Sequence, residues 1–464
     1  MAKLYVFGIG GTGSRVLRSF TMMLAAGVNV EADEIVPVII DPDASNADLT
    51  RTVALMNTYR SVRSNLSFTK GDCTTFFRKD LKQLLVNYTL HIQDTDDKSF
   101  QQFIDLPSMD KASQAMMRML FSEKNLAASM EVGFKGNPNI GSVVLNQMVN
   151  SRDFTEIANS FEQGDKIFII SSIFGGTGAS GFPLLLKTLR TGTTFPNNML
   201  INNSEIGAIT ILPYFKLKAD DESEIDSSTF ISKTKSALAY YENNISKNAS
   251  INALYYLGDN VSGSYENHEG GSAQQNDAHL IEFLAATAIV DFCNKEHPNT
   301  VNKELGLCDI KGSVTFNSFY DEQKKMLFPP LTEFIMMANC LTHKYNYYSS
   351  KSFNANNDNF TNIYHSSFMS NLRSMLQSYL EWLKEMDGNN RALSLFNLKV
   401  VDKPFDVVND VSPKRIFSTK SDYDLVTDRL NSAIRKCNSK DECNKFLEMF
   451  YLATVKLIGE KFNV

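Results

Sequence analysis

The chain has 464 residues, of which 43% are hydrophobic and 21% are charged, and its formal net charge is −6. This length exceeds what one hydrophobic core usually supports, so we expect two domains of an ordinary globular protein. The acidic balance argues against a nucleic-acid partner, because phosphate backbones are bound by clustered Lys and Arg. No apolar run approaches the roughly 18 to 20 residues of a membrane span, and glycines interrupt the N-terminal run where a signal peptide needs its core. We therefore expect a cytoplasmic protein without a membrane span.

Apolar runs alternate with helical patterns over the first part of the chain. The runs that indicate buried strands are "KLYVF", "EIVPVIIDPD", "KIFIISSIF", "EIGAITILPYF" and "INALYYLGD". Helical spacing of apolar residues follows at 14–26, at 182–190 and in "ISKTKSALAYYENNI". Most of 44–130 also has a helical pattern, so we expect a largely helical insertion there. Strands that alternate with helices predict an α/β fold with a doubly wound, mostly parallel sheet.

A different organisation is expected in the second part of the chain. The segment "AHLIEFLAATAIVDFC" is apolar on most faces, which is typical of a helix buried between two domains. We therefore predict a first α/β domain at 1–275, a central helix at 276–294 and a second domain at 295–464. The alternation of strands and helices fades after the central helix. One strand is indicated in "GSVTFNSFY", among several helices, so the second domain is predicted to be α+β.

Two glycine-rich turns follow predicted strands and precede predicted helices. The first is "GIGGTGS" and the second lies within "SSIFGGTGASG". The carboxyl ends of parallel strands meet at one edge of a sheet, which is where ligands bind in such folds. Glycine lets backbone N–H groups approach an anion, and the N-terminus of the following helix adds its dipole. The turns therefore predict a cradle for a di- or triphosphate, built from Gly10, Gly11, Thr12, Gly13, Ser14, Gly175, Gly176, Thr177 and Gly178.

Two other kinds of enzyme are compatible with the first turn alone. Gly8, Gly10 and Gly13 spell GxGxxG, the fingerprint of Rossmann dinucleotide-binding enzymes, with Asp41 as a candidate ribose carboxylate. The spacing "GxGGxGS" is also found in adenylate-forming enzymes of the ubiquitin-activating type. Neither alternative explains the second turn.

Four segments, taken in order, resemble motifs of the tubulin/FtsZ superfamily. They are "GIGGTGS", "VGFKGNPNIG", "GGTGASG" and the pair "ALAYYENN" and "INALYYLGDN". The resemblance covers about 1–294 and implies a nucleotide-binding domain for GTP or GDP, with Mg²⁺ as a further candidate ligand. It adds Gly136, Asn137 and Gly141 to the expected phosphate-binding residues. Phe174 departs from the family pattern, because it stands where the first glycine of the signature loop belongs.

The resemblance also implies a self-assembling GTPase. In this family one subunit holds the nucleotide and the next delivers an acidic group, which requires a head-to-tail homo-oligomer or filament. The segment after the central helix lacks the family's Asn-x-Asp pattern, so Glu304 and Asp309 are catalytic candidates by position only. That departure leaves open a non-polymerising nucleotide-binding module, with a regulatory or defence role and an unidentified protein partner.

The start of the central helix is the expected place for the base. Asn276, His279 and Glu282 recur at i, i+3 and i+6, which would put them on one helical face. The carboxylate of Glu282 could accept from the N–H groups of guanine, and His279 could stack on the ring. The alternative is a polar helix start with Asn276 or Asp277 as the N-cap. Asp41 is a further candidate for the ribose or for Mg²⁺, or an ordinary residue at a strand end.

Overall fold

The computed structural model describes residues 2–69, 72–130, 133–134, 136–217, 230–259, 263–265, 271–297, 301–306, 312–353, 360–414 and 420–462. Within them the central element is a seven-stranded sheet with the order β3-β2-β1-β4-β5-β7-β9. Every neighbouring pair in it is parallel. The strands are β1 (Lys3–Ile9), β2 (Glu34–Ile40), β3 (Asp80–Leu81), β4 (Lys166–Ser172), β5 (Glu205–Ile211), β7 (Ala253–Gly258) and β9 (Val301–Gly306). The predicted α/β fold with a parallel sheet is confirmed.

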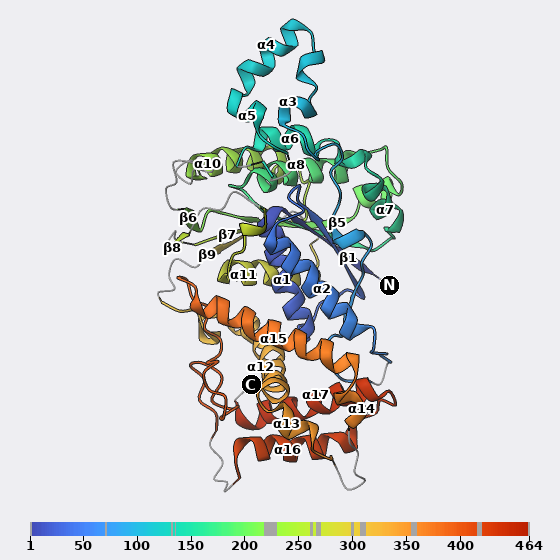
Figure 1. The fold of residues 1–464 in the computed structure, drawn as a ribbon, viewed down its shortest axis with the longest axis vertical. Coiled ribbons are helices and arrows are strands. Elements are labelled where there is room, and N and C mark those ends of the chain that lie inside the picture. The colour runs from blue at the N-terminus through green and yellow to red at the C-terminus, as the bar shows by residue number, and fades with distance from the viewer. Residues whose placement is uncertain are drawn as a thin grey trace.

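Helices cover both faces of this sheet (Figure 1). One face carries α1 (Gly10–Ala26), α2 (Ala47–Arg63) and α11 (Leu280–Cys293), and the other carries α6 (Pro138–Leu145), α7 (Arg152–Ser160), α8 (Gly176–Thr191) and α10 (Phe230–Tyr241). Burial on both faces explains why β1 and β4 are nearly continuous apolar runs rather than alternating ones. A separate pair, β6 (Phe215–Leu217) and β8 (Gly263–Tyr265), lies beyond the carboxyl ends of β5 and β7. No helix in the described ranges is long and apolar enough to cross a bilayer.

The predicted insertion divides into two parts. Its first helix, α2, packs against α1 and so belongs to the body of the domain. The remainder includes α3 (Phe100–Phe103), α4 (Lys111–Leu120) and α5 (Glu123–Ala127), which form an arm that projects away from the sheet (Figure 1). Much of 64–99 is irregular rather than helical.

Helices dominate the chain after β9. They are α12 (Asp321–His343), α13 (Tyr345–Ser349), α14 (Thr361–Tyr364), α15 (Ser367–Gly388), α16 (Asp422–Ala433) and α17 (Glu442–Lys461). In the described residues of 312–462 there is no strand of the kind that forms the large sheet, and isolated bridges pair Val314 with Leu393 and Phe396 with Val408. The strand predicted in "GSVTFNSFY" is therefore wrong, because this segment makes one bridge and then a 3-10 turn. In contrast, β9 lies beyond the predicted central helix and yet completes the large sheet beside β7.

The helix α17 is joined to a segment near the start of the chain. The side chain of Asn444 accepts a hydrogen bond from Ser67 N at 2.8 Å and donates one to Ser67 O at 2.9 Å. The ring of Phe76 packs edge-on against Tyr451 of α17 and Phe334 of α12, with centroids 5.5 and 5.3 Å apart. These contacts bury Phe76 completely.

Candidate functional site

Both glycine turns form the first turns of helices. The helix α1 begins at Gly10, directly after β1, and α8 begins at Gly176, shortly after β4. The predicted helix starts at 14 and 182 are therefore too late. Because β1 and β4 are neighbours in the sheet, the two helix N-termini lie at the same edge. Their N-cap residues are Ile9 and Gly175, which have no side-chain acceptor for the first N–H groups of the helices.

Several of the predicted phosphate-binding glycines are required by backbone packing. A Cβ on Gly13 would lie 2.7 Å from the Cα of Gly8, and a Cβ on Gly178 would lie 2.6 Å from the carbonyl oxygen of Ser172. A Cβ on Gly141 would lie 2.8 Å from the Phe134 ring. These glycines let each helix start pack closely against its strand or its neighbouring helix.

Other glycines bring the three segments together. A Cβ on Gly10 would lie 3.4 Å from Cβ of Thr177, which places the first turn of α1 beside the first turn of α8. A Cβ on Gly176 would lie 3.1 Å from both Gly136 N and Asn137 N, which places the start of α6 on the other side of the α8 turn. We refer to residues 10–14, 175–178 and 136–137 as the glycine cradle. Backbone nitrogen atoms gathered at helix N-termini favour an anion with several oxygens.

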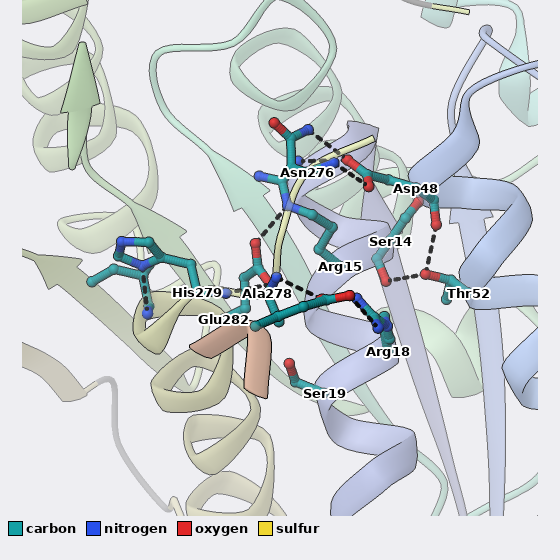
Figure 2. Close-up of polar contacts among 12 residues, drawn as sticks. Ser14, Arg15, Arg18, Ser19, Asp48, Thr52, Asn276, Ala278, His279 and Glu282 are labelled. Atoms are coloured by element: carbon teal, nitrogen blue, oxygen red, sulfur yellow. Dashed lines mark hydrogen bonds and ion pairs between the residues drawn. The ribbon is translucent and has the colours of Figure 1, made fainter. Parts of the chain in front are cut away.

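A buried ionic cluster surrounds Arg15 of α1 (Figure 2). The guanidinium of Arg15 donates to Glu282 Oε1 at 2.5 Å, to Asp48 Oδ2 at 3.1 Å and to Tyr214 Oη at 3.1 Å. Burial alone would lower the pKa of Arg15, but Tyr214, Glu282 and Asp48 raise that pKa well above its ordinary value. Burial raises the pKa of Glu282, and Arg15 opposes that shift. The cluster holds the cradle end of α1 against α2 and α11.

The three predicted base-binding residues lie together in this cluster, but not on one helical face. Since α11 begins at Leu280, Asn276 precedes the helix and His279 is its N-cap. The Asn276 side chain donates to Asp48 Oδ2 at 2.7 Å, and Glu282 Oε2 accepts from His279 N at 3.2 Å. Burial lowers the pKa of His279 to about 3, so its ring is neutral and Nδ1 accepts a backbone N–H of α11. Each residue thus has a partner within the chain, and a contact with a base stays a prediction.

Asp41 lies at the carboxyl end of β2, next to the strand that leads into the cradle. It is buried and accepts a hydrogen bond from Asp43 N at 3.1 Å. Burial raises the pKa of Asp41 to about 7. Asp43 in turn accepts from Ser45 Oγ and Gly271 N. In the part of the chain that the structure describes, no three His, Cys, Asp or Glu side chains gather as metal ligands would. The ribose or Mg²⁺ role of Asp41 stays a prediction.

One of the two catalytic candidates, Glu304, is placed differently from the expected loop. Glu304 lies within β9, where it is the register partner of Tyr256 in β7. Part of the segment after the central helix, Val301–Gly306, is thus a strand of the sheet. Asp309 lies outside the described residues, and no role of either residue is tested by the fold.

Sequence reasoning missed Arg15, Asp48 and the aromatic surroundings of Phe174. The Phe174 ring packs against Phe230 and Phe215, with centroids 5.1 and 5.6 Å apart, so this aromatic residue anchors the second turn. No local sequence pattern indicates that Arg15 is buried in an ionic cluster. Its partners Asp48 and Glu282 are 33 and 267 residues away in the chain.

Comparison with known proteins gives matches among solved structures. No protein-family model matches the sequence, and no curated protein sequence matches it. CetZ2 from Haloferax volcanii, in a GTPγS-bound protofilament, is 13% identical over 63% of this chain and 58% of its own, with a TM-score of 0.30. CetZ from Methanosaeta thermophila is 14% identical over 62% and 52%, with a TM-score of 0.32. TubZ-Bt, in a two-stranded filament, is 11% identical over 83% and 79%, with a TM-score of 0.24.

These proteins are members of the tubulin/FtsZ superfamily, the family that the sequence resembles. The chain spans little more than half of the length of the CetZ structures, 58% and 52%. At these identities and TM-scores the matches carry no conclusion about this chain, and its parallel sheet establishes the α/β class by itself.

Proposed function

We propose that this protein binds guanine nucleotides, GTP and GDP, with their phosphates in the glycine cradle. The observation that carries the proposal is the meeting of two helix N-termini, α1 and α8, whose N-cap residues Ile9 and Gly175 offer no side-chain acceptor. Backbone N–H groups at such ends are satisfied by an anion, and the helix dipoles add to the attraction. A Cβ built on Gly176 would lie 3.1 Å from Gly136 N and Asn137 N, and this closeness supports a cradle for more than one phosphate.

The accessible rim of the cradle is formed by few residues. Gly11 and Thr12 of α1, Gly175 before α8, and Gly136 and Asn137 before α6 are half-buried, whereas most of both helices is buried. These residues are therefore the ones that a bound phosphate chain would touch. The preference for guanine rests on the sequence resemblance, with Asn276, His279, Glu282 and Asp41 as the candidate base and ribose contacts.

We further propose weak GTP hydrolysis that depends on self-association. The site lies at one edge of the sheet, and a neighbouring subunit would have to supply the carboxylate, for which Glu304 and Asp309 are the candidates. Such a head-to-tail contact is heterologous and propagates into filaments unless it closes into a ring. A module that binds nucleotide without assembling is the second candidate function, because the acidic segment lacks the family pattern.

Equilibrium binding of labelled GTP, GDP, ATP and NAD to the purified protein tests the main proposal, together with mass spectrometry of any nucleotide that co-purifies. We expect GTP and GDP to bind more tightly than ATP and NAD. A preference for NAD would instead support a dinucleotide-binding enzyme that uses the first turn alone.

A further inference from the structure

The first turn of α10 contacts the glycine cradle at Gly136 and also Phe174, the residue just before the second glycine turn. The ring of Phe230, which is buried, packs against Phe174 just before the second glycine turn, with centroids 5.1 Å apart. One turn later, Lys233 Nζ donates a hydrogen bond to the carbonyl oxygen of Gly136 at 2.8 Å. The helix lies on the same face of the sheet as α6 and α8 (Figure 1). Phe230 thus anchors α10 so that the Lys233 ammonium is held at the cradle.

The ammonium lies at the end of the cradle that is remote from α1. Gly10 of α1 lies close to Thr177, whereas Gly136 lies close to Gly176. Gly136 has φ +73°, and a Cβ built on it would lie 3.6 Å from Lys233 Nζ. The order along the cradle is therefore α1, the α8 turn, residues 136–137 and finally the ammonium.

The cation at the opposite end has a different electrostatic setting. Arg15 is buried between two carboxylates, Asp48 and Glu282, so the α1 end holds a compensated ionic cluster. The candidate base contacts lie in that cluster as well. A nucleotide with its base near α1 would therefore direct its last phosphate toward residues 136–137 and Lys233. An ammonium pairs strongly with phosphate oxygens, and the pairing strengthens as the phosphate charge grows.

We propose that Lys233 is the specificity-determining residue for the number of phosphates, because its ammonium pairs with the terminal phosphate of a nucleoside triphosphate. This inference rests on the proposed guanine-nucleotide function. The hydrogen bond to Gly136 O keeps the ammonium at the cradle. When a triphosphate binds, its terminal phosphate accepts from the ammonium, either in place of Gly136 O or together with it. A diphosphate ends before this position, so the site would distinguish the two nucleotides.

The test compares Lys233→Met with Lys235→Met, which removes an exposed ammonium from the same helix. Affinities for GTP and GDP are measured by equilibrium titration, and thermal unfolding checks that each variant is folded. We expect Lys233→Met to weaken GTP about tenfold to a hundredfold, as for loss of a charge-assisted bond, and GDP less than about threefold. Lys235→Met should leave both affinities unchanged, and Lys233→Arg should retain part of the preference for GTP.

The outcomes separate this inference from the function on which it rests. Equal losses of GTP and GDP affinity in Lys233→Met would overturn it, since the lysine would then only position residues 136–137. No loss for either nucleotide would overturn it as well. If the unaltered protein binds neither GTP nor GDP, the proposed function itself fails and the inference fails with it.

Discussion

Replacing Gly176 by Ala should weaken GTP binding while the protein stays folded. The new Cβ would lie 3.0 Å from Phe134 Cβ and 3.1 Å from Gly136 N and Asn137 N. Carbon atoms prefer separations of about 3.5 to 4.0 Å, so the start of α6 has to move away by a few tenths of an ångström. Overpacking of this kind costs about 1 to 3 kcal/mol. GTP binding would require the start of α6 to return to its original position, so this overpacking cost appears as about a fivefold to hundredfold loss of GTP affinity.

The helix itself should tolerate the substitution, because alanine is the better helix former and Gly176 lies in the first turn of α8. Gly459→Ala in α17 is the matched control, since nothing lies within 4 Å of its Cβ position. That control should bind GTP normally and be more stable by roughly 0.5 to 1 kcal/mol. Titration with a fluorescent GTP analogue measures the affinities, and thermal unfolding measures stability. A folded Gly176→Ala protein that binds GTP as tightly as the unaltered protein would refute the cradle, and Gly176→Val, with its larger side chain, should abolish binding.

Three further results are expected. Glu333 of α12 is 6% exposed, and burial raises its pKa from 4.5 to about 7, so the stability that the protonated side chain contributes is fully present below about pH 4.5 and is lost as the pH rises through about 7. Glu333→Gln should therefore raise the free energy of unfolding by about 3 kcal/mol at pH 8 and change it little at pH 4. An equal effect at both pH values in denaturant titrations would contradict the assignment. Arg15→Met leaves Asp48 and Glu282 buried without their cation, so it should destabilise the protein by about 3 to 5 kcal/mol in the same titrations, and a loss below about 1 kcal/mol would show that the cluster is not structural. The GTPase rate should rise more than linearly with protein concentration, and a rate strictly proportional to concentration would indicate a monomeric site. Glu304→Ala should remove turnover without changing GTP affinity if Glu304 completes the site of the neighbouring subunit.

The sheet was predictable where its strands are buried on both faces. The segment of β4 is apolar and β-branched, and its pattern leaves little alternative to a buried parallel strand. In contrast, β9 reads "VNKELG", with polar residues and an exposed Val301, because an edge strand pairs on one side only. Sequence patterning therefore does not separate it from a loop. The early start of α8 was missed because glycines are poor helix formers, and they are helical here because of close packing, Gly178 against Ser172 of β4 and Gly176 against residues 136–137.

The candidate site was predictable in position more than in detail. Glycine spacing indicated both turns between strand and helix, because close backbone approach requires glycine there, but it did not indicate that the helices begin at Gly10 and Gly176. The spacing of His279 and Glu282 is also that of a capping box, and the structure uses it as one. Periodicity cannot distinguish a carboxylate that caps a helix from one that contacts a base. The partners of Arg15 come from distant parts of the chain, so only the folded arrangement of α1, α2 and α11 identifies them.

The contact between α17 and Ser67 has a consequence for the order in which the protein can fold during synthesis. The two partners are 377 residues apart, so Ser67 leaves the ribosome long before Asn444 exists. Phe76, which α12 and α17 cover in the native state, must stay uncovered over most of that interval. The α/β region therefore cannot reach its final packing by itself, and a fragment cut after the central helix would expose this aromatic surface and tend to aggregate.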